Sequence, residues 1–438
     1  MQNFYMTMLY TGLISAMGLC ANMTQAACTQ TVVAQTEDSY AAKIIFGNIN
    51  LPSKHLLPAG SVIDSKVIPP TTYNFSGAHG ESLLWTCDKS DLNQIYFLAA
   101  TNGDDRVGGY WDIGGADGLQ DVYATYFAYV GLKQSMNGIN LTRYWKKIPI
   151  QQYDEDDKKI YIRLKHLPHL EATLYRVSQL PPAYGATTHY CGTGALPTTG
   201  SYGSCNQPSA YIQLSGESSV YMPFGRDQIG EDSAQFYRFW GSDNGFGYGL
   251  NTAANTLSAQ PACVVRNNTP LVTLPTISAQ ALNQGQSDPV PFQVQIECEN
   301  IVSSGTAKGQ TAIAFQPHSN AYQHAVDLGL SNTQGAVSHL LSDAYGQDTQ
   351  LAQGVGIQIS NSTNQQAMWL QQPTAITGGG AANGWYPVLE GQPQYIGETV
   401  GEHGMYMQSY QAELKALPNQ TATPGRVKAT ATIVVKVQ

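Results

Sequence analysis

The C-terminal end of the chain, residues 426–438, alternates between apolar and polar side chains. The apolar positions are Val427, Ala429, Ala431, Ile433, Val435 and Val437. Because successive side chains of a β-strand point to opposite faces, this pattern predicts a long strand with one buried face. In the simplest interpretation it is the final strand of a sheet and pairs on both sides within its own domain.

The composition favours an exported all-β protein. Charged residues make up 12% of the chain, about half of the usual share, whereas 43 Gly, 22 Pro and 26 Tyr favour turns and strands. A hydrophobic share of 42% excludes global disorder, and 438 residues suggest roughly two to three domains. The net charge of -9 argues against nucleic acid as a partner.

The N-terminal segment resembles an export signal. Residues 1–27 contain no Asp, Glu, Lys or Arg, and residues 6–19 are mostly apolar. This pattern predicts a secretory signal peptide over residues 1–27, cleaved near Ala26 or Ala27. The alternative is an N-terminal membrane anchor, although the apolar run is shorter than the roughly 20 residues that a span needs.

The cysteines are typical of an oxidising compartment. Of the seven Cys, Cys20 lies in the predicted signal peptide, which leaves an even number in the mature chain. Such a set indicates disulfides, and no pair has the C-x-x-C spacing of zinc or redox sites. Spacing alone leaves the connectivity open, above all for the first four, but we expect sequential pairing: Cys28–Cys87, Cys191–Cys205 and Cys263–Cys298.

Two β-rich domains are expected. The stretch 251–262 is small, polar and uncharged, as in a linker. Period-two alternation occurs on both sides of it, at residues 159–165 and at residues 291–298. We therefore predict domains over residues 28–252 and 262–438, with a linker over residues 253–261.

Residues 262–438 resemble a pilin domain of the chaperone–usher pathway. The features that carry this resemblance are Cys263 and Cys298 with the apolar Val272, Leu274 and Ile277 between them, the segment Gln-Gly-Val-Gly-Ile-Gln-Ile at 353–359, the segment Tyr-Gln-Ala-Glu-Leu at 410–414, and the alternating strand after Gly425. Their order and spacing carry the resemblance together.

The resemblance implies an incomplete immunoglobulin-like domain that lacks its last strand. A periplasmic pilus chaperone would fill the resulting groove, and the N-terminal strand of an adjacent pilus subunit would then replace the chaperone. The outer-membrane usher would be a further partner of assembly. The groove-lining or register-setting positions would be Val427, Ala429, Ala431, Ile433, Val435 and Val437.

The first domain is similar to the receptor-binding domains of two-domain fimbrial tip adhesins. The matching segments are 125–132, 137–150, 162–168 and 172–178. The similarity implies an elongated β-sandwich of jelly-roll-like topology that binds a host glycan, glycoprotein or matrix protein. Because Cys28 closely follows the predicted cleavage site, we expect a subunit that accepts a strand, donates none, and stands at the fimbrial tip on the cell surface.

The loop at residues 102–121 is the leading candidate for a receptor site. It combines glycines with flat aromatic faces and charged hydrogen-bonding groups, as sugar or protein recognition requires. The candidate ligand-binding residues are Asp104, Asp105, Arg106, Tyr110, Trp111, Asp112 and Asp117. The alternative is a polar turn system in which Trp111 packs into the core.

Three further segments carry aromatic or glycine-rich sequence. For residues 237–249 a loop at the domain junction is the simpler interpretation, and residues 190–205 suit an exposed loop closed by a disulfide. Structural packing is the simpler interpretation of Arg143, Tyr144 and Trp145.

No enzyme motif is found in the sequence. It contains neither G-x-S-x-G nor H-E-x-x-H, and we expect no catalytic residue, metal site or cofactor. Two alternatives to an adhesin stay open. One is a tip subunit that initiates assembly without binding a receptor, and the other is a secreted carbohydrate-active enzyme with a β-sandwich accessory domain.

Overall fold

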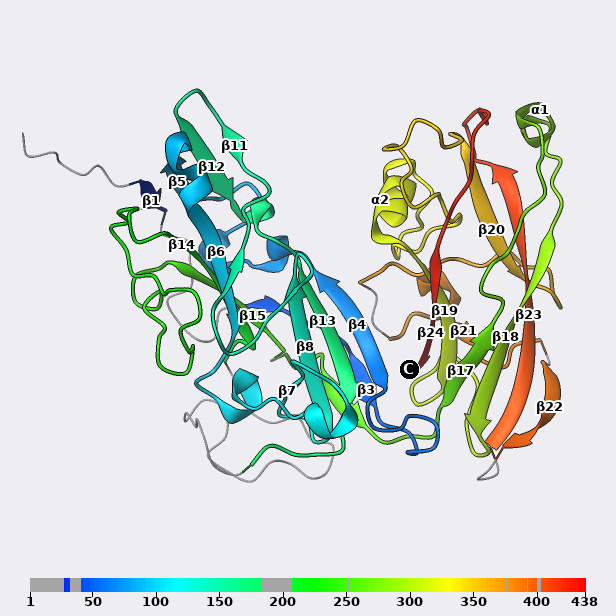
Figure 1. Ribbon diagram of the computed structural model, residues 1–438. Coiled ribbons are helices and arrows are strands. Elements are labelled where there is room, and N and C mark those ends of the chain that lie inside the picture. Colours follow the sequence, from blue (N-terminus) through cyan, green and yellow to red (C-terminus); the bar gives the residue numbers. More distant parts are fainter. Residues whose placement is uncertain are drawn as a thin grey trace, which may run out of the picture.

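The computed structural model describes residues 27–31, 41–182, 207–250, 252–374, 377–391, 393–399 and 403–438. These residues form two β-rich lobes, an N-terminal lobe with strands β1 to β16 and a C-terminal lobe with strands β17 to β24 (Figure 1). The predicted signal peptide up to residue 26, the pair Cys191 and Cys205, and the segment 190–205 lie outside the described residues.

Three larger sheets and one strand pair build the N-terminal lobe. The first sheet has the order β1 (Cys28–Gln30), β5 (Leu83–Asp88), β12 (Lys159–Arg163), β11 (Asp154–Glu155). The second has β10 (Lys146–Ile148), β6 (Ile95–Thr101), β14 (Ala210–Gly216), β15 (Gly245–Gly249), β2 (Ala42–Lys43). The third has β4 (Val62–Ile68), β13 (Leu170–Arg176), β8 (Val130–Met136), β7 (Tyr123–Ala124), with β9 (Ile139–Asn140) beside β8. The pair is β3 (Asn48–Asn50) with β16 (Thr256–Ser258).

The C-terminal lobe consists of two facing sheets. One has the order β17 (Cys263–Asn268), β18 (Val290–Glu299), β23 (His403–Ala416), β20 (Val355–Asn361), with β22 (Gln394–Thr399) beside β23. The other has β21 (Tyr386–Pro387), β19 (Thr311–Pro317), β24 (Ala431–Val437). Aromatic rings join them: Phe315 packs edge-on against Tyr410 and Phe292, with ring centroids 5.0 and 6.0 Å apart.

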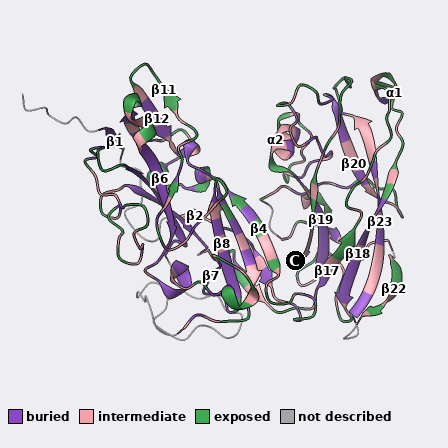
Figure 2. Cartoon of the chain, viewed as in Figure 1, coloured by how far each residue is buried: buried purple, intermediate pink, exposed green. Residues whose placement is uncertain are grey.

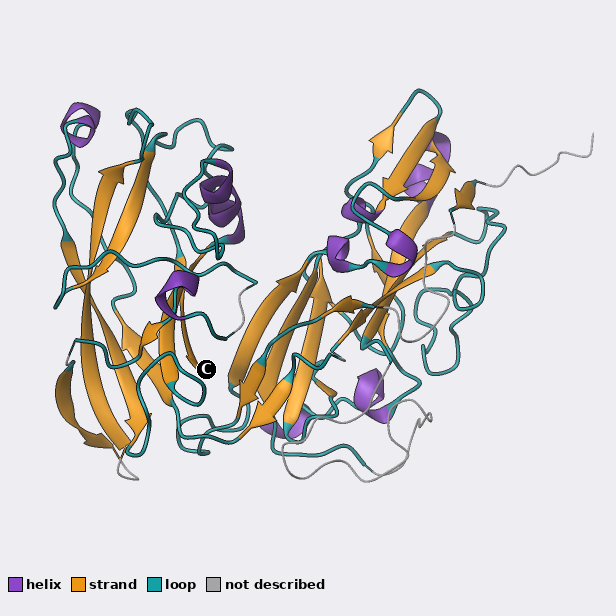
Figure 3. Cartoon of the chain, turned by 180° about the vertical axis from the view of Figure 1, so that it is seen from behind, coloured by secondary structure: helices purple, strands orange, loops and turns teal. Residues whose placement is uncertain are grey.

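Helices are few and short within the described part of the chain. The α-helices are α1 (Ala279–Asn283) and α2 (Ser319–Asp327), and single helical turns occur at Pro70–Thr72, Phe75–Gly77, Lys89–Gln94, Arg106–Tyr110, Gly115–Asp117, Leu164–His166 and Gly380–Asn383. None of these helices is long and apolar enough to cross a membrane. Strands dominate both lobes (Figure 3), which confirms the all-β prediction.

The predicted alternation corresponds to observed burial. In β18, Phe292, Val294, Ile296 and Cys298 are all buried on one face. The strands β6, β8 and β19 are largely buried and form the centres of their sheets (Figure 2). Apolar burial of this kind contributes about 25 cal/mol per Å² and is the main force that holds the sheets together.

The terminal strand pairs on one side only among the described residues. β24 runs antiparallel to β19, with Ile433 opposite Phe315 and Val435 opposite Ile313. The prediction that β structure begins at residue 426 is wrong by several residues. Arg426 instead forms an isolated bridge with Leu351, and Thr430 donates its backbone N–H to Asp343 Oδ1.

Two of the three predicted disulfides are confirmed. Cys28 is bonded to Cys87, and Cys263 to Cys298; in each pair the Cα atoms are 4.0 Å apart. Each bond joins residues that stand opposite each other on neighbouring antiparallel strands. They therefore fix the first strand of each lobe to its sheet.

The segment that joins the lobes is partly strand. Thr256–Ser258, inside the stretch expected to be a linker, pairs in parallel with Asn48–Asn50 of the N-terminal lobe. Asn255 is fully buried, and its Oδ1 accepts the backbone N–H groups of Phe46 and Gly47 at 2.7 and 3.1 Å. The bounds 28–252 and 262–438 remain predictions.

Removal of the Cys263–Cys298 bond should destabilise the C-terminal lobe selectively. The bond closes a sequence separation of 35 residues. Loss of this constraint on the unfolded chain predicts a decrease of about 3–4 kcal/mol in the free energy of unfolding for the Cys263→Ala, Cys298→Ala double variant. Denaturant unfolding of the full chain measures this decrease in the free energy of unfolding. The Cys28→Ala, Cys87→Ala variant is the matched control. A loss below about 1 kcal/mol would contradict the expectation.

Candidate functional site

Two hollows lie along the C-terminal segment, one beside residues 425–429 and one beside β24. Residues 271–277 line the first and the start of β17 lines the second, and the two hollows together are called the acceptor groove from here on. Its larger part has a volume of about 900 Å³ and is lined by apolar side chains that include Val272, Leu274, Leu351 and Val427. The groove thus lies where the sequence placed the C-terminal alternating strand.

The apolar side chains of the groove are only partly covered. Val427, Ala429, Ala431, Ile433 and Val435 are half-buried and pack on the edges of the core clusters. Leu271 on the opposite wall is 78% exposed. Val437 differs from the other predicted positions because it is fully buried. A row of apolar groups left half-open to water is a hydrophobic surface that lacks a partner.

Among the residues that the structure describes, no strand pairs with the backbone at this edge. Gln438 N–H donates to Gln310 at 2.8 Å and Thr430 C=O accepts from His318 at 3.3 Å, so the even-numbered residues face β19. In an antiparallel ladder the alternate residues direct their N–H and C=O groups to the opposite edge. The odd-numbered residues of β24 therefore present both their apolar side chains and their backbone polar groups to the acceptor groove.

Gly425 sets the path of this wall. A Cβ atom at position 425 would lie 2.3 Å from the backbone N of Ala352. Only glycine allows the chain to pass so close to residues 351–352 before it enters the edge strand. The local sequence thus explains why the alternating segment starts after this residue.

The N-terminal lobe closes one end of the groove. A smaller part, about 180 Å³, is lined by Ile433, Val435 and Val437 and also by Ile49 and Val62 of the N-terminal lobe. Here Lys436 forms an ion pair with Asp64 and donates to Phe46 C=O at 3.0 Å. Burial lowers the pKa of the neighbouring Lys66 to about 8, against the opposing effect of Asp64.

The structure places most of the predicted receptor residues in structural roles. Asp105 and Arg106 are buried, and the Asp105 carboxylate accepts the N–H of Val107 at 3.0 Å at the start of the Arg106–Tyr110 turn. The carboxylate of Asp112 accepts the N–H groups of Gly114 and Asp121, each at 3.0 Å.

Two more of the seven candidates stabilise turns or small clusters. Asp117 Oδ2 accepts the N–H of Ser178 at 2.8 Å. Trp111 is half-buried and packs on a small cluster of Ile113, Val122 and Val177. This arrangement corresponds to the polar turn system that the sequence left open as the alternative. Asp104 and Tyr110 are the two that lie beside a surface feature suited to a ligand.

Asp104 lies at a shallow aromatic pocket of about 50 Å³. The residues that line the aromatic pocket are Asn102, Asp104, Trp145, Tyr211, Ser233, Tyr237, Phe239 and Trp240. Tyr237 is 50% exposed, whereas Phe239 and Trp145 are buried beneath it. The pocket joins the 102–121 loop to the 237–249 segment, which the sequence had placed at a domain junction.

A ridge of aromatic and charged side chains lies on the neighbouring surface. The Arg143 guanidinium lies 4.2 Å from the ring centroid of Tyr110 and 5.3 Å from that of Tyr144. Its Nε is 2.9 Å from Asp232 Oδ1. Tyr144 is 46% exposed, and only Trp145 of this trio has the fully buried position that structural packing predicts.

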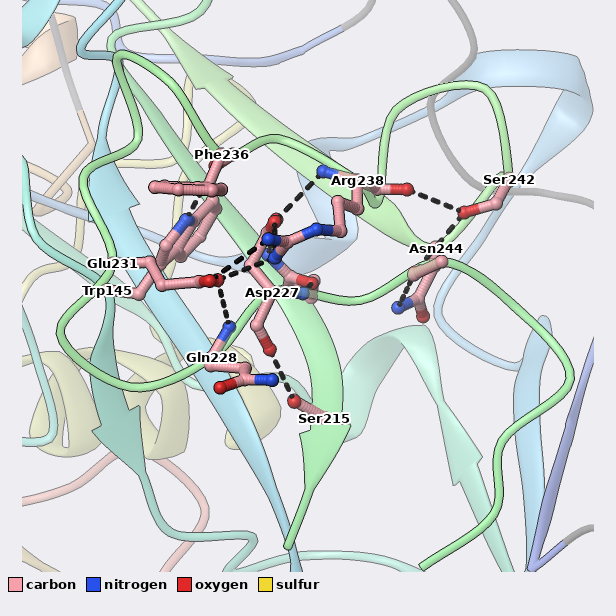
Figure 4. A network of polar contacts seen from close by, with 11 residues as sticks. Trp145, Ser215, Asp227, Gln228, Glu231, Phe236, Arg238, Ser242 and Asn244 are labelled. Carbon is pink, nitrogen blue, oxygen red and sulfur yellow. Dashed lines mark hydrogen bonds and ion pairs between the residues drawn. The ribbon is translucent and has the colours of Figure 1, made fainter. Parts of the chain in front are cut away.

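A polar network positions the wall of the aromatic pocket (Figure 4). The fully buried Asp227 accepts the backbone N–H of Arg238 at 3.0 Å and the amide of Gln213 at 2.8 Å. Arg238 also forms a two-pronged ion pair with Glu231, at 2.7 and 3.0 Å. Burial raises the pKa of the Asp227 carboxyl, and the hydrogen bonds from Arg238 and Gln213 oppose that rise.

Asp227→Ala should disrupt this wall. Its loss leaves the buried side-chain amide of Gln213 and the part-buried backbone N–H of Arg238 without their acceptor, which predicts a decrease of about 2–3 kcal/mol in the free energy of unfolding. Glu231→Gln removes only a partly exposed ion pair and should cost at most about 1 kcal/mol. Denaturant unfolding of both variants provides the comparison, and equal losses would show that Asp227 does not have this role.

Comparison with known proteins gives one family match. The family model described as "Fimbrial protein" matches residues 252–438. No curated protein sequence matches the chain.

Several solved structures are similar at low sequence identity. The CupB6 tip adhesin from Pseudomonas aeruginosa is 13% identical, with 94% of this chain and 95% of that chain covered and a TM-score of 0.25. The CsuC–CsuE chaperone–tip adhesion subunit complex from Acinetobacter baumannii is 11% identical, with 94% of this chain and 100% of that chain covered and a TM-score of 0.21. The P pilus rod subunit PapA is 14% identical and covers 41% of this chain and 93% of its own, with a TM-score of 0.23.

The family match covers the part of the sequence in which the pilin resemblance was found. It confirms the fimbrial assignment of that part. Residues 252–438 of this chain match the fimbrial protein family model.

Proposed function

We propose that the chain is the tip adhesin of a chaperone–usher fimbria. The observation that carries the proposal is the acceptor groove, in which one strand edge offers backbone groups and half-buried apolar side chains together. An added strand could pair with β24 and cover Ile433 and Val435 at the same time. Strand addition of this kind uses main-chain hydrogen bonds for affinity and alternate side chains for specificity.

Two partners of different kinds would fill the acceptor groove. A periplasmic chaperone would cover it before assembly, because an exposed apolar strand edge promotes aggregation. The N-terminal strand of the next pilus subunit would then take its place, and the outer-membrane usher would be the site of this exchange. The predicted destination is the surface of the cell.

The position at the tip is supported by two strand segments that precede Cys263. Thr256–Ser258 are already paired with Asn48–Asn50 of the N-terminal lobe. Cys28–Gln30 are likewise paired with β5 and anchored by the Cys28–Cys87 bond. Both segments are built into the N-terminal lobe, so neither is a strand offered to a neighbour.

The N-terminal lobe would bind a glycan, glycoprotein or matrix protein at the aromatic pocket. Tyr237 and Trp240 offer ring faces for the apolar face of a sugar or for an apolar side chain, and Asn102 and Asp104 offer polar groups beside them. Tyr, Trp and Arg dominate the energetic centres of protein interfaces. The proposed receptor site is therefore the aromatic pocket and not the whole 102–121 loop, and Asp104 belongs to both.

Substitution on the two faces of β24 tests the acceptor groove. Ile433→Arg places a charge on the groove side, where an added strand would bury it, and should abolish co-purification with the chaperone. Thr432→Arg lies on the exposed side of the same strand and should leave co-purification unchanged. Equal recovery of the chaperone with both variants would contradict strand addition.

Substitution in the aromatic pocket tests receptor binding. Tyr237→Ala and Trp240→Ala should weaken binding of the full chain to glycan or matrix-protein arrays by at least about tenfold. Tyr395→Ala, which removes an equally exposed tyrosine of the C-terminal lobe, is the control and should bind normally. A chain that binds no receptor at all would instead favour a tip subunit that only initiates assembly.

A further inference from the structure

Two histidines and a glutamate from three distant parts of the sequence meet where the lobes touch. Among the described residues, one nitrogen of His55, one nitrogen of His403 and one carboxylate oxygen of Glu297 all lie within 4.8 Å of one another. His55 belongs to the N-terminal lobe, and the other two belong to β23 and β18 of the C-terminal lobe. His55 Nε2 lies 3.0 Å from Glu297 Oε1.

The glutamate is buried and held in a fixed orientation. Its side chain is only 3% exposed, and its Oε2 is bound by Arg266 Nε. Arg266 sits at an irregularity of β17, between Val265 and Asn267, and also donates to the His55 C=O at 3.2 Å. Thr399 Oγ1 is hydrogen-bonded to Oε1. Supporting contacts of this type orient the ligands of metal sites.

His403 has a ring nitrogen whose hydrogen-bonding capacity is not used by the described residues. His403 is 8% exposed, its Nε2 lies 3.4 Å from Ser53 Oγ, and its Nδ1 is buried without a hydrogen-bond partner among the described residues. Its ring stacks on that of His55, with centroids 4.7 Å apart and planes 29° apart. A buried polar atom without a partner is rare and often marks an ion or water that completes the site.

We propose that His55, Glu297 and His403 bind a zinc ion that joins the two lobes. Two imidazoles and one carboxylate are a donor set that zinc accepts with a fourth position left for water. Tetrahedral zinc places its ligand atoms about 3.4 Å apart, so small rotations of the two rings would bring the donors from their present spacing into range. Imidazole nitrogens disfavour calcium and magnesium, which select oxygen ligands.

The surroundings provide access and partial charge balance. A cavity of about 360 Å³, lined by His55, Arg266, Glu297, Thr399 and Met405, opens beside the cluster. His55 is 40% exposed at its mouth, which gives a hydrated ion a route to the donors. Glu299 stands opposite His403 in the ladder and adds a second carboxylate on the same strand as Glu297.

Such an ion would fix the docking of the N-terminal lobe. The loop that carries His55 contacts the C-terminal lobe through hydrogen bonds, among them Ser53 N–H to Glu299 Oε1 at 3.3 Å, and through the stacking of His55 on His403. A bound metal replaces weak contacts between the lobes with coordination bonds from both sides. We therefore expect zinc to stabilise the arrangement of the lobes without touching either the acceptor groove or the aromatic pocket.

Calorimetric titration of the chelator-treated full chain with zinc chloride tests the site. Wild-type chain should bind one zinc ion, and His55→Asn should weaken binding by at least about tenfold. His79→Asn, which changes an exposed histidine far from the cluster in sequence, is the matched control and should bind as the wild type does. Because His55 is partly exposed, its substitution should not prevent folding.

Two further readouts make the result decisive. Cobalt(II) added in place of zinc should give visible d–d absorption in wild type and His79→Asn but not in His55→Asn. Zinc should raise the unfolding temperature of the same two proteins only. Equal zinc affinity in His55→Asn and His79→Asn, or no saturable binding below about 100 µM, would overturn the proposal and leave the cluster as a hydrogen-bonded contact.

Discussion

The proposed function depends physically on the outer edge of β24, with which no other strand of the described residues pairs. β24 pairs with β19 through its even-numbered residues, and its odd-numbered residues face the acceptor groove with both side chain and backbone. Exposure of these apolar side chains to water is unfavourable in free energy, and the unpaired backbone groups of a strand edge favour association with another strand. A single added strand would remove both at once, which links the period-two pattern of residues 427–437 to the proposed function in assembly.

The two lobes are joined by more than their connecting segment. Lys436, next to the end of β24, pairs with Asp64 of the N-terminal lobe, and His55 reaches Glu297 on the other side of the interface. The same contacts bring Val62 to the end of the acceptor groove. The residues of the aromatic pocket and those of the acceptor groove therefore belong to one connected structure, although they lie on different lobes.

Local patterns in the sequence predicted the features that depend on local geometry. Alternation identified β18, β12 and most of β24, and sequential pairing gave Cys263–Cys298. The candidate receptor site was harder to predict, because a loop rich in Asp, Tyr and Gly has the same composition whether it binds a ligand or supports its own turns. Asp105 and Asp112 proved to bind backbone N–H groups. The aromatic pocket combines segments near residues 102, 145, 211 and 237, and no spacing rule brings such distant segments together.

The alternation of bonded and open positions along β24 has a direct measurement. Amide hydrogen exchange at single-residue resolution should show Ile433 and Val435 exchanging rapidly in the chain alone, while Thr432 and Val434 are protected by β19. Addition of a donor-strand peptide should protect Ile433 and Val435 as well. Protection of all four amides before any strand is added would contradict the account, because it would mean that the domain already completes its own sheet.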